Sequence, residues 1–226
     1  AGYADGEAFG ISAGGNVIVG ANYPFFGSQE AQAVRWVADG LGGFTVEGLG
    51  DLPGGNVFSR ALAVSSYGSV IVGVSESDRG MEVCRWTVTG GMQGLGIQAD
   101  AVSVSADGST VLAGQDIWDE NNGARNLESV MSQLGVPDLA GWSGLMGLVM
   151  TGDGRTIVGT GTNPLGDQEA WRAVLPENLF APQYAGSTSF SGQADNPLTF
   201  RLNLFAPDVS DQDSATQQFQ VRLIGN

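Results

Sequence analysis

The chain of 226 residues contains no histidine, no lysine and a single cysteine. Without histidine there is no imidazole base, no histidine metal ligand, and no Ser-His or Cys-His pair. Pairs of carboxylates remain as candidate catalytic groups, but the acidic loop with Asp116, Asp119 and Glu120 is more simply interpreted as a solvated turn. The sequence therefore predicts a protein that is not an enzyme.

Two further absences limit the class of protein. The single cysteine, Cys84, excludes an intramolecular disulfide, and its place in an apolar strand pattern predicts a small buried side chain. No run of eighteen apolar residues is present, so we expect no membrane span. The chain begins at Ala1 without an initiator methionine, which fits a mature form left after signal-peptide removal.

The charge is strongly one-sided, because 24 acidic residues outnumber nine arginines and leave a net charge of -15. An acidic surface repels nucleic acid and anionic lipid. The expected electrostatic partners are cations and basic proteins, although acidity also serves solubility alone.

What the chain has in abundance is glycine, 36 residues of it, between short apolar runs. One hairpin pattern recurs four times, at residues 11–20, 64–73, 104–113 and 150–159. Each copy has an apolar strand end, Ser or Thr, a turn closed by glycine, and a β-branched run. The shared glycines are spaced by 53, 40 and 46 residues, and we expect them in left-handed turn positions: Gly15, Gly68, Gly108 and Gly154.

A second signal follows each hairpin, a strand that carries tryptophan and, in three copies, a neighbouring arginine. The tryptophans are interpreted as packing between repeat units rather than as a ligand cage, because a stacked core needs one large side chain per unit. The repeat-core candidates are Trp36, Trp86, Trp118, Trp171, Arg35, Arg85 and Arg172. By register Arg172 matches Arg85, and Trp171 is moved two positions along the same strand face.

These signals predict an all-β fold, a β-propeller-like array of four blades of roughly 45 residues over residues 1–175, with a β-solenoid as the alternative. Closed and open arrays both remain compatible with the pattern. A helical insertion is expected within repeat three, over residues 126–146, with Asn126 as N-cap and Gly135 as stop.

Residues 176–226 are expected to form a C-terminal tail of β-strands, because apolar and polar residues alternate there. The apolar faces, which we interpret as assembly strands, consist of Phe200, Leu202, Leu204, Phe219, Val221 and Leu223. Asp208, Asp211 and Asp213 lie between these strands and are a candidate for a calcium site, although solvated turn aspartates are far more common than ligands. No other cofactor is expected.

The hairpin, the Arg-Trp strand and the segment Gly50-Asp51-Leu52-Pro53-Gly54-Gly55 together resemble the HAF family of extracellular repeat proteins of bacteria. The segment from Gly141-Trp142 to Glu169-Ala170-Trp171 is similar to the last repeat of that family. The resemblance covers about residues 8–175. It implies export and a propeller-like fold, and it supplies no catalytic residues.

Two functions fit this sequence. The preferred one is a secreted structural protein that assembles with itself into a homo-oligomer or filament of an extracellular or cell-surface matrix, with the tail strands pairing with a neighbouring subunit. The alternative is a monomeric extracellular module that binds a protein or glycan through loops. Native molecular size separates the two.

Overall fold

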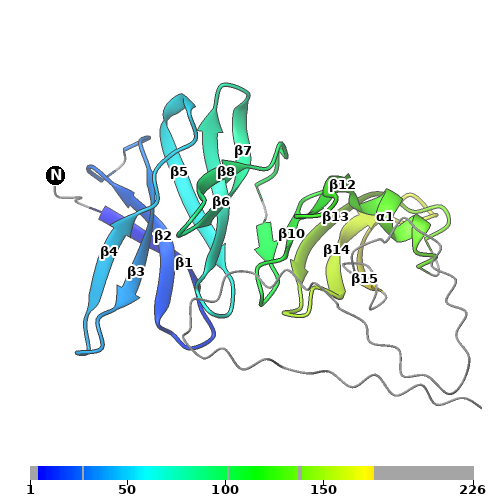
Figure 1. Cartoon of the computed structure of the whole chain (residues 1–226). Coiled ribbons are helices and arrows are strands. Elements are labelled where there is room, and N and C mark those ends of the chain that lie inside the picture. Colours follow the sequence, from blue (N-terminus) through cyan, green and yellow to red (C-terminus); the bar gives the residue numbers. More distant parts are fainter. Residues whose placement is uncertain (1–4, 27, 101, 137–138, 176–226) are drawn as a thin grey trace, which may run out of the picture. The chain divides into compact units, whose positions relative to one another are not determined.

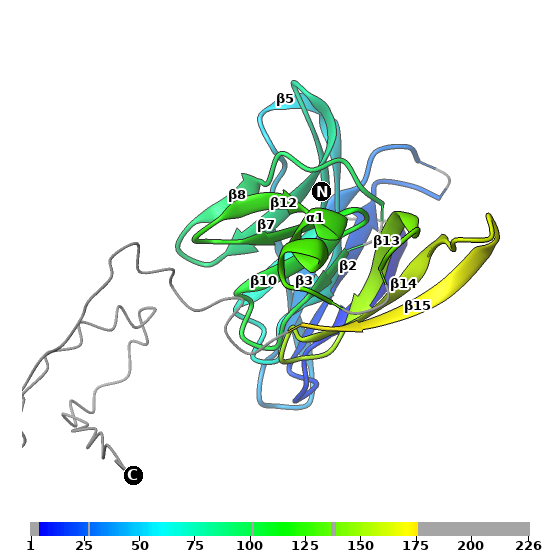
Figure 2. The ribbon, with the colours of Figure 1, turned by 90° about the vertical axis from the view of Figure 1, so that its right-hand side faces the viewer.

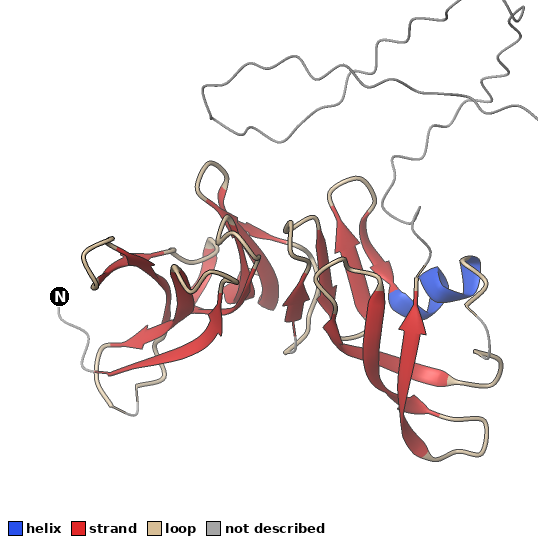
Figure 3. Cartoon of the chain, turned by 90° about the horizontal axis from the view of Figure 1, so that it is seen from below, coloured by secondary structure: helices blue, strands red, loops and turns tan. Residues whose placement is uncertain are grey.

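The computed structural model describes residues 5–26, 28–100, 102–136 and 139–175. These residues form fifteen strands and one helix, arranged as four antiparallel sheets that follow one another along the chain (Figures 1 and 3). In each sheet consecutive strands are neighbours, which is the meander of a propeller blade and not the coiled parallel order of a β-solenoid. The tail 176–226, with its assembly strands and calcium candidates, lies outside the described residues.

The first sheet contains β1 (Asp5–Ile11), β2 (Val17–Tyr23), β3 (Gln32–Ala38) and β4 (Phe44–Gly48). The second contains β5 (Gly54–Val64), β6 (Val70–Ser77), β7 (Gly80–Thr87) and β8 (Gly91–Gly94). The third contains β9 (Val102–Val104), β10 (Thr110–Ala113), β11 (Asp116–Asp119) and β12 (Gly123–Asn126). The fourth contains β13 (Ser143–Met150), β14 (Thr156–Thr162) and β15 (Gln168–Val174), so it has three strands among the described residues.

Each repeated hairpin folds through the same local contacts. The hydroxyl of the repeat Ser or Thr accepts a hydrogen bond, 3.0 Å long, from the main-chain N–H five residues later: Val17 to Ser12, Val70 to Ser65, Thr110 to Ser105, and Thr156 to Thr151. The turn glycine donates its N–H to the carbonyl of the same Ser or Thr. The bond to the hydroxyl explains why every copy has Ser or Thr at that position, because the hydroxyl gives a hydrogen-bond acceptor to the first main-chain N–H of the next strand.

The turns of successive sheets are also joined by main-chain hydrogen bonds. Ala13 N–H donates to the Ser66 carbonyl over 3.1 Å, Ser66 N–H to the Ala106 carbonyl over 2.9 Å, and Ala106 N–H to the Gly152 carbonyl over 2.7 Å. The four residues occupy the same position in the repeat. They form a directional ladder in which each sheet donates to the sheet that follows it.

Three apolar clusters lie between successive sheets. One joins the first and second sheets through Val17, Val19, Ile71 and Trp86, and one joins the second and third through Val72 and Val111, among others. The largest joins the third and fourth sheets and includes the helix α1 (Leu127–Gln133). Burial of sheet faces against each other therefore stabilises the array, at about 25 cal/mol per Å² of apolar surface.

The helix begins as expected and the insertion ends earlier than expected. Asn126 is the N-cap and accepts from Ser129 N–H, and Gly135 follows the C-cap with a φ of 63°. Leu127, Val130 and Met131 bury the helix against the fourth sheet (Figure 2). The predicted insertion to residue 146 was too long, because β13 begins at Ser143 and residues 143–146 pair with β14.

Candidate interaction surface

The first and second sheets meet through an arginine that stacks on a tryptophan. The Arg35 guanidinium lies 4.5 Å from the centre of the Trp86 ring. Glu47, directly opposite Arg35 on β4, holds the guanidinium by an ion pair of 2.6 Å. Trp86 is 7% exposed, and such a stacked cation–π contact is strongest when it is desolvated.

The second and third sheets repeat this contact one unit further along. Arg85 lies with its guanidinium carbon 5.5 Å from the centre of the Trp118 ring. The two pairs occupy equivalent positions, because Arg85 faces Val72 as Arg35 faces Val19 across the strand pair. The arginine of one sheet thus covers the tryptophan of the next.

Between the third and fourth sheets, apolar residues stand in place of both the arginine and the tryptophan. Ile117 occupies the arginine position opposite Leu112, and Ala173 occupies the tryptophan position opposite Ile157. Both side chains are buried in the cluster that includes α1. Trp171 sits two residues before Ala173 and packs at the edge of this cluster. The arginine and the tryptophan of this contact therefore occur together: where the arginine is absent from one sheet, the tryptophan that it would cover is absent from the next.

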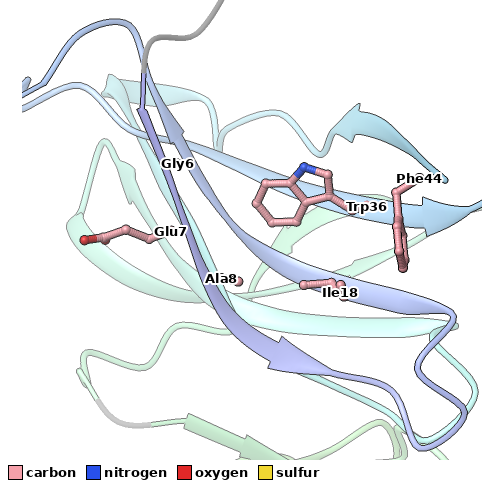
Figure 4. A pocket seen from close by; sticks show the side chains of 6 residues that line it. All are labelled: Gly6, Glu7, Ala8, Ile18, Trp36 and Phe44. Atoms are coloured by element: carbon pink, nitrogen blue, oxygen red, sulfur yellow. The ribbon is translucent and has the colours of Figure 1, made fainter.

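At the start of the array the tryptophan has nothing stacked on it. Trp36 is half-buried and points away from the second sheet, beside Ile18, Ala8 and Phe44 (Figure 4). These side chains line a shallow apolar hollow of about 330 Å³. On the second sheet, the side that packs against the first sheet carries Val64, Ile71, Trp86 and Met92. The equivalent residues of the first sheet form what we call the Trp36 face: Ile11, Ile18, Trp36 and Val46.

At the other end of the array the arginine has no tryptophan to cover. Arg172 is exposed opposite Val158, and its side chain makes no ion pair, hydrogen bond or ring contact with a described residue. Three valines on this side of the sheet, Val149, Val158 and Val174, are 42% to 56% exposed. We call the set the Arg172 face: Val149, Val158, Arg172 and Val174.

The predicted turn glycines all have positive φ, namely 73° at Gly15, 76° at Gly68, 77° at Gly108 and 71° at Gly154. Their surroundings differ. A Cβ added to Gly68 would collide with Val17 of the preceding sheet, whereas a Cβ on Gly15 would meet nothing within 4 Å. The turn glycine is thus also a packing position at Gly68 and at Gly108, where an added Cβ would collide with Val70.

The acidic candidates do not converge. Asp116 and Asp119 lie three residues apart on β11 and so point to opposite faces. Burial raises the pKa of the Asp116 carboxyl above its usual range. Asp119 is 3% exposed and is occupied by an ion pair of 2.5 Å with Arg125 and by the N–H groups of Asn121 and Asn122. In the described segments no group of three or more Cys, Asp or Glu side chains could hold a metal ion.

Sequence reasoning missed the residues that surround Trp36 and Arg172. Ile18 and Val158 occur at the same positions as buried residues of the inner sheets, and Ile11 and Val46 at the positions of the partly buried Val64 and Met92. A position-by-position alignment of the four repeats could have identified them. No helix in the part of the chain that the structure describes has the length and apolarity of a transmembrane span.

No protein-family model matches the chain, and no curated protein matches it in sequence. Among solved structures it is similar to TolB from Acinetobacter baumannii, at 11% identity and a TM-score of 0.42, over 76% of this chain and 43% of that one. It is also similar to the β-propeller domain of the Trilobed protease from Pyrococcus furiosus, at 8% identity and a TM-score of 0.39, over 77% of this chain and 72% of that one. This chain therefore spans less than half of the TolB chain.

Proposed function

We propose that the chain is a non-catalytic structural module that assembles with copies of itself. The observation that supports this most directly is that both terminal sheets expose the face that the inner sheets bury. Ile11 and Val46 are 61% and 56% exposed, whereas their equivalents on the second sheet, Val64 and Met92, pack into an apolar cluster. Exposed apolar faces of this kind on a soluble chain usually mark interaction sites.

The place of assembly in this proposal is outside the cell. The resemblance of the hairpin and Arg-Trp strands to HAF repeats supports export, and the net charge of -15 favours solubility until subunits meet. Residues 176–226 are proposed to support this assembly by strand pairing with the same neighbouring subunit.

The test is sedimentation velocity of the full chain over a hundredfold range of concentration, with and without a chelator. We expect the weight-average sedimentation coefficient to rise with concentration and to be unchanged by the chelator. A single monomer species at every concentration would contradict the proposal. Dissociation by the chelator would show instead that cations bridge the subunits.

The second candidate function is binding of a protein or glycan by a monomer. It is favoured by Phe25 and Phe26, which are 61% and 88% exposed in the loop between β2 and β3. Exposed loop aromatics are common ligand contacts. Under this alternative, the chain would remain monomeric and Phe26→Ala would abolish retention on the ligand; a glycan array provides the screen.

A further inference from the structure

We infer that copies of the chain join head to tail, with the Arg172 face of one copy packed on the Trp36 face of the next. The Arg172 guanidinium would then cover the Trp36 ring as Arg35 covers Trp86 within one chain. This contact rests on the proposed self-assembly and identifies the surfaces that carry it. The partner it requires is a second copy, because among the described residues neither face covers the other.

Each of the two faces has, position by position, the equivalents of a sheet face that is already packed within the chain. The second sheet packs four side chains against the first sheet: Val64, Ile71, Trp86 and Met92. The Trp36 face has apolar side chains at the same four register positions: Ile11, Ile18, Trp36 and Val46. The first sheet meets them with Val19 and Arg35, whose equivalents at the far end are Val158 and Arg172. The contact between copies would therefore repeat a contact that the chain already makes.

Between the third and fourth sheets, the arginine and the tryptophan of this contact are both absent. Ile117 and Ala173 change together, so an arginine position and the tryptophan position that follows it are coupled. At these two positions of the repeat the chain has one more arginine, Arg172, and one more tryptophan, Trp36, and neither has such a partner among the described residues. They are the two halves of one more contact of the same kind.

The main-chain hydrogen bonds between the turns support the same contact. In the ladder of turn hydrogen bonds, each N–H donates to a carbonyl of the next sheet, and the last acceptor is Gly152. The N–H of Gly152 has no hydrogen-bond partner within the described ranges. Ala13 at the start of the ladder donates its N–H, but its carbonyl accepts no hydrogen bond from a described residue. A following copy would bring its Ala13 carbonyl to the Gly152 N–H and extend the ladder by one step.

Gly15 has room for the side chain of a neighbouring sheet. Gly68 and Gly108 lie against Val17 and Val70 of the preceding sheets, where no side chain larger than hydrogen fits. Gly15 has the same φ and the same place in the repeat but nothing within 4 Å of an added Cβ. A preceding copy would place its Thr156, the equivalent of Val17, over this glycine.

The experiment uses two full-length variants, each with one altered face, in sedimentation velocity. Trp36→Arg sets an arginine against the Arg172 of the next copy, and Arg172→Ala removes the stacking cation. We expect each variant alone to associate at least about 30-fold more weakly than the unaltered chain, the loss typical of a central Arg or Trp contact. An equimolar mixture should form a dimer and stop there, because each copy keeps one intact face.

The controls separate this contact from general effects of the substitutions. Leu165→Arg makes the same kind of change on a loop residue that is 87% exposed, and we expect it to associate as the unaltered chain does. Circular dichroism checks the fold, and Val46→Arg replaces Trp36→Arg if that variant does not fold.

The outcomes have distinct meanings. If the unaltered chain is monomeric throughout, both the proposed function and this contact are wrong. If it associates and Trp36→Arg, Val46→Arg and Arg172→Ala associate equally well, assembly occurs through another surface and the contact alone is wrong. Dimers formed by each single variant without mixing would also overturn it, because they would require a symmetric interface.

Discussion

At the scale of single residues, the same amino acid at the same repeat position has different roles depending on what precedes it. Gly15 and Gly68 both have φ near 75°, so alanine strains both turns similarly, but only Gly68 faces Val17. We expect Gly68→Ala to lower the free energy of unfolding by about 1 to 3 kcal/mol more than Gly15→Ala does, the usual cost of overpacking. Urea denaturation at low protein concentration measures the difference; equal losses would show that Val17 yields without cost.

Cys84 offers a second test at this scale, since it is 3% exposed in the centre of β7. Burial is the largest of the effects that raise the pKa of its thiol to about 12, so the reactive thiolate is scarce at neutral pH. We expect an aromatic disulfide reagent to react with the native chain at the rate of unfolding and with the urea-unfolded chain at once. Rapid labelling of the folded protein would contradict this account of β7.

At the scale of the element, the repeated hydroxyl should matter most where its hydrogen bond is buried. Ser65 is 1% exposed and pairs the Val70 N–H, whereas Thr151 makes the same bond on an exposed turn. We expect Ser65→Ala to destabilise the fold by about 1 to 3 kcal/mol, because a buried N–H loses its partner. Thr151→Ala should cost clearly less, because water replaces the hydroxyl. Similar thermal shifts for the two variants would show that the bond is not the reason for the repeat.

The elements were largely predictable and their contacts were not. The turn glycines, the Asn126 cap and the register of Arg172 follow from local rules, and all appear in the structure. That Trp86 is buried and Trp36 is not could not be predicted, because the two side chains are equivalent within their own sheets. Only the presence of a neighbouring sheet separates them, and sequence patterns within one repeat carry no such information.

At the scale of the whole molecule, the charge opposes the assembly that the end faces favour. Each chain carries a net charge of -15, so copies repel one another at low ionic strength. The proposed contact is apolar with one stacked cation, which salt screens little once it is desolvated. We expect association to strengthen as salt rises from about 50 mM to about 500 mM. Weakening over this range, seen by light scattering, would indicate contacts between exposed charges instead.

The most direct test of the account is covalent capture of the head-to-tail contact. An ideal Cβ on Gly152 would lie 3.3 Å from the Ala106 Cβ, so residues at this position of successive sheets are close to disulfide distance. Ala13 is the equivalent residue of the first sheet. Full-length chains carrying both Ala13→Cys and Gly152→Cys are oxidised gently and separated by size without reducing agent.

The account predicts a regular ladder of covalent multimers from the double variant. It predicts no multimer beyond a dimer from either single variant, because Cys84 is buried and cannot extend the chain. A double variant that stays monomeric, at concentrations where the unaltered protein associates, would contradict the claim that Gly152 of one copy meets Ala13 of the next.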